Sequence, residues 1–210
     1  MQTLQQCKND ISVIIPVYNL ERCIRPMLDS LKEQKLGDYK AEIIFVLNNC
    51  TDKSEKVIRR YDFDYTIINC TTQGCGPARN AGFDIATGTY IWFMDGDDWL
   101  LSDTAIKDVL DKAYAEDLNV LRIPFMSDLF LYQYYAMVWQ YLLRREFVQE
   151  LRFPEYQPAE DDAYMASVLK KNGYDSNSHM SLPCVNKALY YYNYMREGSN
   201  MYRVWHGERI

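Results

Sequence analysis

Three carboxylates follow an apolar run in the segment YIWFMDGDDWL, residues 90–100. Asp95, Asp97 and Asp98 fall within four positions, directly after residues of strand type. Like charges this close repel, and burying a carboxylate without a partner at the end of a strand is costly. A divalent cation would relieve both problems, because Mg²⁺ and Mn²⁺ take oxygen ligands from one or two carboxylates and from substrate phosphates. The alternative is a solvated acidic turn, since Asp and Gly are common turn residues.

The segments around these acids alternate between strand and helix patterns. Apolar or β-branched runs predict strands at residues 11–17, 42–47, 65–68, 90–94 and 120–123. Apolar residues at helical spacing predict helices at about 24–31, 78–86, 106–113 and 160–172. Pro26 falls in the first turn of the first of these helices. A further helix is predicted from an Asp52–Glu55 capping box through Tyr61. This alternation predicts an α/β fold with a Rossmann-like, mostly parallel central sheet flanked by helices. Such sheets bind ligands at the carboxyl ends of their strands, where residues 95–98 are expected.

Composition limits the classes of partner. The 210 residues are 48% hydrophobic and 25% charged, as in a globular domain, and the formal charge of −6 argues against a nucleic-acid or anionic-membrane surface. Six cysteines show no metal spacing, so reduced thiols are expected instead of zinc or disulfides. The first ten residues lack the apolar core of a signal peptide, and no stretch is long and apolar enough to be a transmembrane segment. A cytoplasmic protein is therefore expected.

Four blocks of the sequence together resemble family 2 glycosyltransferases with the glycosyltransferase A fold. They are ISVIIPVYN at 11–19, ARNAGFDIATGTYIWFMDGDDWL at 78–100, AEDDAYMASVLKKNGY at 159–174 and LYYYNYMREGSN at 189–200. The resemblance implies a metal-dependent, inverting transfer of a sugar from a nucleotide-diphosphate sugar to a hydroxyl of a glycan or lipid-linked acceptor. It also implies one domain over 1–210, with a nucleotide-sugar-binding half at about 11–100 and a shorter acceptor and catalytic-base half at about 119–200.

The acids after the fourth strand would hold the cofactor in this family. By motif position, Asp95 and Asp97 are implied to bind Mn²⁺ or Mg²⁺, with Asp95 and Gly96 also next to the nucleotide. The ion would offset negative charge on the leaving diphosphate. Asp98 either orients the other acids or caps a turn.

Two other segments are implied to contact the nucleotide. Pro16, Val17 and Tyr18 follow the first strand, where the family holds the base, and the Tyr18 ring could stack on it. A tyrosine half-buried at the strand end is the alternative. Arg79 resembles the family arginine that approaches the base or the diphosphate, at a helix start that suits anions. A surface salt bridge is the alternative for Arg79.

The chain departs from the family after the second strand. The family usually has two aspartates, a glycine and a serine there, whereas this chain has Leu47, Asn48, Asn49 and Cys50. The amide oxygen of Asn48 can still accept the uracil imide proton while its nitrogen donates to a neighbouring carbonyl. A uridine donor is therefore still favoured, and a plain turn role for Asn48 is the alternative.

The catalytic base is expected in the block at 159–174. Asp161 resembles the acid that removes the proton from the acceptor hydroxyl, and the helix start should keep it ionised. Glu160 and Asp162 are close rivals, and helix capping alone is the alternative. Arg196 could reach the diphosphate, but a solvated loop arginine is the alternative. Some relatives with this fold bring a late histidine to the metal, and His206 is the weaker candidate for that position.

The aromatic stretch at residues 125–147 lies where the family binds its acceptor, although dense aromatic residues also form core. Most of Tyr132, Tyr134, Tyr135, Trp139 and Tyr141 are expected to pack. The short segment leaves little for a lid, so the acceptor is small, or a membrane-associated or protein partner completes the site. A non-catalytic or partner-dependent sugar-nucleotide-binding protein is the rival class. A sugar nucleotidyltransferase is disfavoured because PVYNLERC, after the first strand, lacks glycine.

Overall fold

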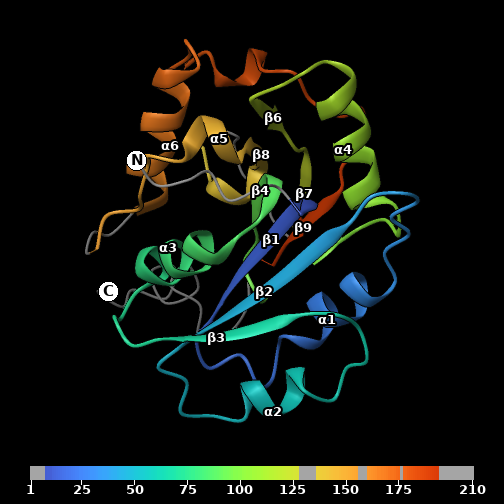
Figure 1. Cartoon of the computed structure of the whole chain (residues 1–210), viewed down its shortest axis with the longest axis vertical. Coiled ribbons are helices and arrows are strands. Elements are labelled where there is room, and N and C mark those ends of the chain that lie inside the picture. Colours follow the sequence, from blue (N-terminus) through green and yellow to red (C-terminus); the bar gives the residue numbers. More distant parts are fainter. Residues whose placement is uncertain (1–7, 128–135, 156–159, 176, 194–210) are drawn as a thin grey trace.

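The computed structural model describes residues 8–127, 136–155, 160–175 and 177–193 (Figure 1). Its main sheet has six strands in the order β3-β2-β1-β4-β8-β6. The parallel strands are β1 (Asn9–Val17), β2 (Ala41–Asn48), β3 (Thr66–Cys70) and β4 (Gly88–Phe93). β8 (Tyr141–Arg144) lies antiparallel between β4 and β6 (Val120–Arg122). The predicted α/β fold with a mostly parallel sheet is confirmed.

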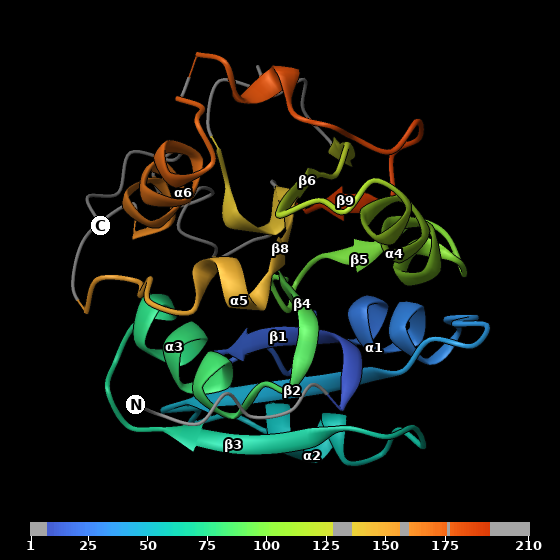
Figure 2. The ribbon, with the colours of Figure 1, turned by 45° about the horizontal axis from the view of Figure 1, so that its top comes forward.

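Helices cover both faces of this sheet (Figures 1 and 2). One face packs against α1 (Arg25–Lys32), α2 (Ser54–Ile58) and α4 (Ala105–Ala115), and the other against α3 (Cys75–Ile85), α5 (Arg145–Val148) and α6 (Glu160–Lys171). Val13 and Ile15 of β1 belong to the first core, and Ile14 belongs to the second. Burial on both faces explains the continuous apolar run of β1.

A second, smaller sheet is rich in aromatic residues, with Trp99, Phe125 and Tyr190–Tyr192 on its strands. It has the order β5-β9-β7, with β5 (Trp99–Leu100) antiparallel and β7 (Phe125–Ser127) parallel to the central β9 (Tyr190–Tyr192). Two short 3₁₀ helices are η1 (Val138–Gln140) and η2 (His179–Ser181). Trp139 and Tyr141 are buried, which confirms that they pack, whereas Tyr132, Tyr134 and Tyr135 lie outside the described residues.

Two predicted helices differ from those observed. The helix predicted from Asp52 through Tyr61 spans only Ser54–Ile58, and its predicted capping box does not form. Asp52 accepts the Ser54 N–H at 2.9 Å, but Glu55 pairs with Arg59 instead of reaching back. α3 begins at Cys75, earlier than predicted. In the part of the chain that the structure describes, none of the helices combines the length and apolar character needed to cross a bilayer.

Candidate active site

The loops that follow the four parallel strands meet at one edge of the sheet. β1, β2, β3 and β4 run in the same direction, so their carboxyl ends lie side by side. These loops carry Tyr18, residues 49–52, residues 71–74 and residues 95–98. The sequence-predicted nucleotide and metal residues are therefore neighbours in the fold.

The acidic residues after β4 form a tight turn, residues 95–98, which we call the acidic turn. The Asp98 N–H donates to the Asp95 carbonyl at 3.1 Å. Gly96 is packed so closely that an added Cβ would lie 2.7 Å from Cδ1 of Leu20. A side chain at position 96 would therefore require the end of the Leu20 side chain to move. The role of Gly96 at the nucleotide stays a prediction.

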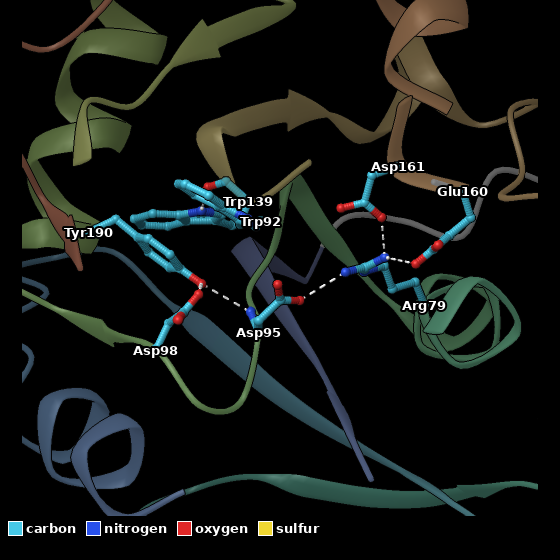
Figure 3. Close-up of polar contacts among 8 residues, drawn as sticks. All are labelled: Arg79, Trp92, Asp95, Asp98, Trp139, Glu160, Asp161 and Tyr190. Atoms are coloured by element: carbon cyan, nitrogen blue, oxygen red, sulfur yellow. Dashed lines mark hydrogen bonds and ion pairs between the residues drawn. The ribbon is translucent and has the colours of Figure 1, made fainter. Parts of the chain in front are cut away.

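Arg79 joins the acidic turn to the start of α6 (Figure 3). It is 3% exposed, and its Nη2 donates to Oδ1 of Asp95 at 2.8 Å. Its Nη1 donates to Oε1 of Glu160 at 2.9 Å and to Oδ1 of Asp161 at 2.5 Å. The surface salt-bridge alternative for Arg79 is therefore wrong, because one buried guanidinium holds three carboxylates from two elements.

Residues near Arg79 in α3 contact the segment that precedes α6. The Asn80 side chain exchanges two hydrogen bonds with the backbone of Phe153, at 2.8 and 2.9 Å. A Cβ on Gly76 would lie 2.7 Å from the Pro154 carbonyl oxygen, so α3 approaches this segment as closely as only glycine allows. Sequence reasoning missed both contacts, although both residues lie beside Arg79 in the sequence.

Burial and charge act against each other in this cluster. Burial raises the pKa of Asp95 and that of Asp161 each to about 6, although Arg79 opposes both shifts. Burial alone would lower the pKa of Arg79, but Asp161 and Asp95 raise it well above its ordinary value. The helix start was expected to keep Asp161 ionised; burial outweighs that effect, and the carboxylate is ionised at pH 7 by a narrower margin.

Asp98 faces away from this cluster. It is 1% exposed, and Tyr190 Oη donates to its Oδ2 at 2.6 Å. The backbone N–H of Asn193 donates to its Oδ1 at 2.8 Å. Both carboxylate oxygens of Asp98 thus bond to the β9 segment, which agrees with an orienting role.

Asp95 and Asp97 offer the oxygen ligands that Mg²⁺ and Mn²⁺ prefer. Among the described residues, no group of three or more His, Cys, Asp or Glu side chains is arranged to hold an ion. This donor set fits an ion that completes its coordination with substrate phosphate oxygens, and it does not fit a site made of protein alone.

Hydrogen bonds join the loops that follow β1 and β2. Oδ1 of Asn19 accepts the Thr51 N–H at 2.8 Å, and Sγ of Cys50 donates to the Val17 carbonyl at 3.1 Å. Tyr18 is 54% exposed at this edge, whereas Pro16 and Val17 are buried. The Tyr18 ring is therefore available for stacking, whereas the contact of Pro16 and Val17 with a nucleotide stays a prediction.

Asn48 braces the loop before α3. Its Nδ2 donates to the carbonyls of Cys70 and Thr72 at 3.1 and 2.7 Å, and its Oδ1 accepts the Gly74 N–H at 2.9 Å. The predicted donation to a neighbouring carbonyl is confirmed. The side chain is buried and braces the loop, so a purely structural role is the alternative to base recognition. Base recognition by Oδ1 stays a prediction that relies on its second lone pair.

A pocket of about 170 Å³ opens beside this loop. Its lining consists of Leu47, Asn49, Cys50, Asp52, Glu55, Asn69, Cys70 and Thr71.

Two residues considered for the site, Arg196 and His206, lie outside the described residues.

Comparisons with known proteins agree with this geometry. The family model described as glycosyl transferase family 2 matches residues 12–171. The uncharacterized glycosyltransferase EpsJ of Bacillus subtilis (strain 168) is 32% identical over 187 residues, which cover 70% of this chain and 54% of that protein. The chain thus spans about half the length of EpsJ.

Solved structures share the fold. S. aureus TarS 1-349 in complex with UDP-GlcNAc matches with a TM-score of 0.79 at 22% identity, covering 92% of this chain and 60% of that chain. A mannosyltransferase from Pyrobaculum calidifontis in complex with GDP-Man and Mn²⁺ matches with a TM-score of 0.70 at 18% identity, covering 93% and 60%. The expected glycosyltransferase A fold is thereby confirmed.

Proposed function

Because the chain belongs to glycosyl transferase family 2, we propose that it transfers a sugar from a nucleotide-diphosphate sugar to an acceptor hydroxyl, with inversion at the anomeric carbon. The observation that supports this most is the buried cluster in which Arg79 joins Asp95 to Asp161 at the carboxyl edge of the sheet. The proposal takes residues 11–100 and 119–200 as halves of one domain, since β8 and β6 extend the sheet of β1–β4.

The donor in this proposal is a UDP-sugar. The exposed Tyr18 ring would stack on the base, and Oδ1 of Asn48 would accept its imide proton. TarS in complex with UDP-GlcNAc supports uridine, but the mannosyltransferase in complex with GDP-Man has the same fold. The fold alone therefore leaves the base open, and the proposal for uridine depends on Asn48.

Asp95 and Asp97 would hold Mn²⁺ or Mg²⁺ together with the donor diphosphate. When bound, such an ion stabilises negative charge on the leaving diphosphate. Arg79 keeps the Asp95 carboxylate in place through Oδ1. The acidic turn holds both acids on a short, closely packed segment, so their positions are fixed before the donor binds.

Asp161 would act as the general base. It would take the proton of the acceptor hydroxyl while that oxygen bonds to the anomeric carbon and the bond to the diphosphate oxygen breaks, with its electron pair leaving on the diphosphate. The ion pair with Arg79 fixes the orientation of the Asp161 carboxylate. The acceptor would be a glycan or lipid-linked glycan precursor.

A second candidate is a sugar-nucleotide-binding protein that needs a partner for transfer, or does not catalyse it. Two observations favour it. Leu47 stands at a position where the family has an acid. The Asn48 side chain bonds to the protein's own backbone, where Oδ1 accepts the Gly74 N–H. A transfer assay separates the two candidates: UDP-glucose, UDP-galactose and UDP-GlcNAc are each incubated with Mn²⁺ and a panel of glycan acceptors, and product is detected by mass spectrometry. Product that requires the chain supports transfer, whereas donor binding without product across the panel supports the second candidate.

A further inference from the structure

The hydroxyl of Tyr190 bonds to two points of the acidic turn. It donates to Oδ2 of Asp98 at 2.6 Å and accepts the backbone N–H of Asp95 at 3.0 Å (Figure 3). A phenol has one donor hydrogen and lone pairs that accept, so a single oxygen serves both bonds. The first and last residues of the acidic turn are therefore fixed to one side chain of β9.

The ring of Tyr190 is itself held rigidly. It is fully buried and stacks on Trp139, with ring centroids 4.9 Å apart and planes 13° apart. Trp139 in turn accepts a hydrogen bond from Nε1 of Trp92 through its carbonyl at 2.8 Å. Because the ring cannot shift without disturbing this stack, the position of its hydroxyl is determined by the aromatic core.

Other contacts hold the acidic turn on both sides. Asn193, just after β9, donates its backbone N–H to Oδ1 of Asp98 at 2.8 Å and its Nδ2 to the Asp97 carbonyl at 3.2 Å. On the opposite side, Arg79 holds the Asp95 carboxylate. The backbone of the acidic turn is thus fixed by the β9 segment, and one carboxylate is fixed by α3.

We propose that Tyr190 is a positioning residue for the cation site: its hydroxyl holds the acidic turn in the conformation that presents Asp95 and Asp97 to Mn²⁺ or Mg²⁺. This inference rests on the metal-dependent function proposed above. Groups that hydrogen-bond behind metal ligands tune affinity, and their loss weakens metal binding by about 10- to 100-fold. Tyr190 would act in this way through the backbone of the acidic turn.

The test uses Tyr190→Phe, which removes one oxygen and keeps the ring that stacks on Trp139. UDP is the probe, and calorimetry gives the Mn²⁺ concentration that half-saturates Mn²⁺-dependent UDP binding. We expect this concentration to rise by about 10-fold or more, with UDP binding in excess chelator unchanged. Hydrogen exchange should also become faster at the Asp95 amide, which loses its acceptor.

Tyr141→Phe is the matched control. Tyr141 is also fully buried, but its hydroxyl has no hydrogen-bond partner among the described residues. Removing it should leave the Mn²⁺ dependence unchanged. Asp98→Ala provides a second route if Tyr190→Phe folds poorly, because it removes the acceptor of the same hydrogen bond and should shift the Mn²⁺ dependence in the same direction.

Two results would overturn the inference in different ways. If wild type shows Mn²⁺-dependent UDP binding and neither Tyr190→Phe nor Asp98→Ala shifts it, Tyr190 has a packing role only, and the proposed function stands. If wild type binds UDP equally in Mn²⁺ and in chelator, the metal-dependent function fails, and the positioning role fails with it.

Discussion

Arg79 and Asp161, 82 positions apart in the chain, are joined by a buried ion pair of 2.5 Å. Arg79 belongs to the helix that follows the third strand, and Asp161 belongs to the helix that would carry the base. Because Arg79 also pairs with Asp95, one guanidinium group contacts both the proposed metal site and the proposed base. A change at Arg79 should therefore affect stability and both parts of the reaction.

Replacing Arg79 with methionine should destabilise the fold. The change leaves three partly buried carboxylates without their partner. Breaking a fully buried ion pair costs about 3–5 kcal/mol, so that range is the upper limit expected here. Urea denaturation would measure the loss in the free energy of unfolding. Arg59→Met is the control: Arg59 pairs with Glu55 on the surface, so its loss should cost less than about 1 kcal/mol. Equal costs for the two variants would contradict the role given to the cluster.

The pH dependence of transfer should reflect Asp161 together with Asp95, because burial raises the pKa of both to about 6. A general base works only when ionised, and burial raises the pKa of Asp161 to about 6. Activity should therefore be present above this pH and decline as the pH falls through about 6, in a profile of kcat/KM, which reports the free enzyme. Asp162→Asn should keep the same profile. A profile that stays flat well below the pKa would remove Asp161 from proton transfer.

Asn48→Asp should separate base recognition from bracing of the loop. An aspartate cannot donate to the Cys70 and Thr72 carbonyls, so we expect a loss of about 1–3 kcal/mol in the free energy of unfolding. The preference for UDP over CDP should survive, because an acceptor oxygen remains for the imide proton. Thermal melting and calorimetry would measure these two effects.

Asn49→Asp is the control for Asn48→Asp, because the exposed Asn49 makes one bond of the same kind, from Nδ2 to the Thr71 carbonyl at 3.2 Å. It should be nearly neutral for stability. Equal affinity for UDP and CDP in wild type and in Asn48→Asp would show that position 48 only braces the loop.

Nucleotide-diphosphate binding should require a divalent ion. The diphosphate and the acids of the acidic turn repel each other, and the ion would bridge them. Asp97→Ala should weaken the Mn²⁺ dependence of UDP binding more than Asp108→Ala, a surface acid that pairs with Lys187. Calorimetry in Mn²⁺ and in excess chelator would measure the difference. Equal UDP affinity in the two buffers would rule out an ion between protein and donor.

The sequence predicted the sheet well because β1, β2 and β4 are buried on both faces and read as continuous apolar runs. It did not predict β8, whose four residues lie in a stretch where aromatic packing hides any alternation. The site acids were predicted by their position after a strand. The contacts of Arg79 with Asp95, Glu160 and Asp161 were not, because they join residues 16 to 82 positions apart that only the folded chain brings together.

Tyr190 shows the same limit. Its block resembles a family motif, but three consecutive tyrosines give no sign of which hydroxyl turns inward. Only the pairing of β9 with β5 places Tyr190 opposite Leu100, directly behind the acidic turn. Contacts set by tertiary packing between distant segments are the part of the site that local patterns do not contain.

Sugar transfer by Asp161→Asn at saturating UDP-sugar and Mn²⁺ is the most direct test of the proposed mechanism. The amide keeps the shape of the side chain but cannot accept the proton, so transfer should fall by about 10²-fold or more while donor affinity, measured separately, is retained. Glu160→Gln and Asp162→Asn should have smaller effects. Near-normal transfer by Asp161→Asn would contradict its role as base, and near-normal transfer by all three variants would remove the start of α6 from the chemistry.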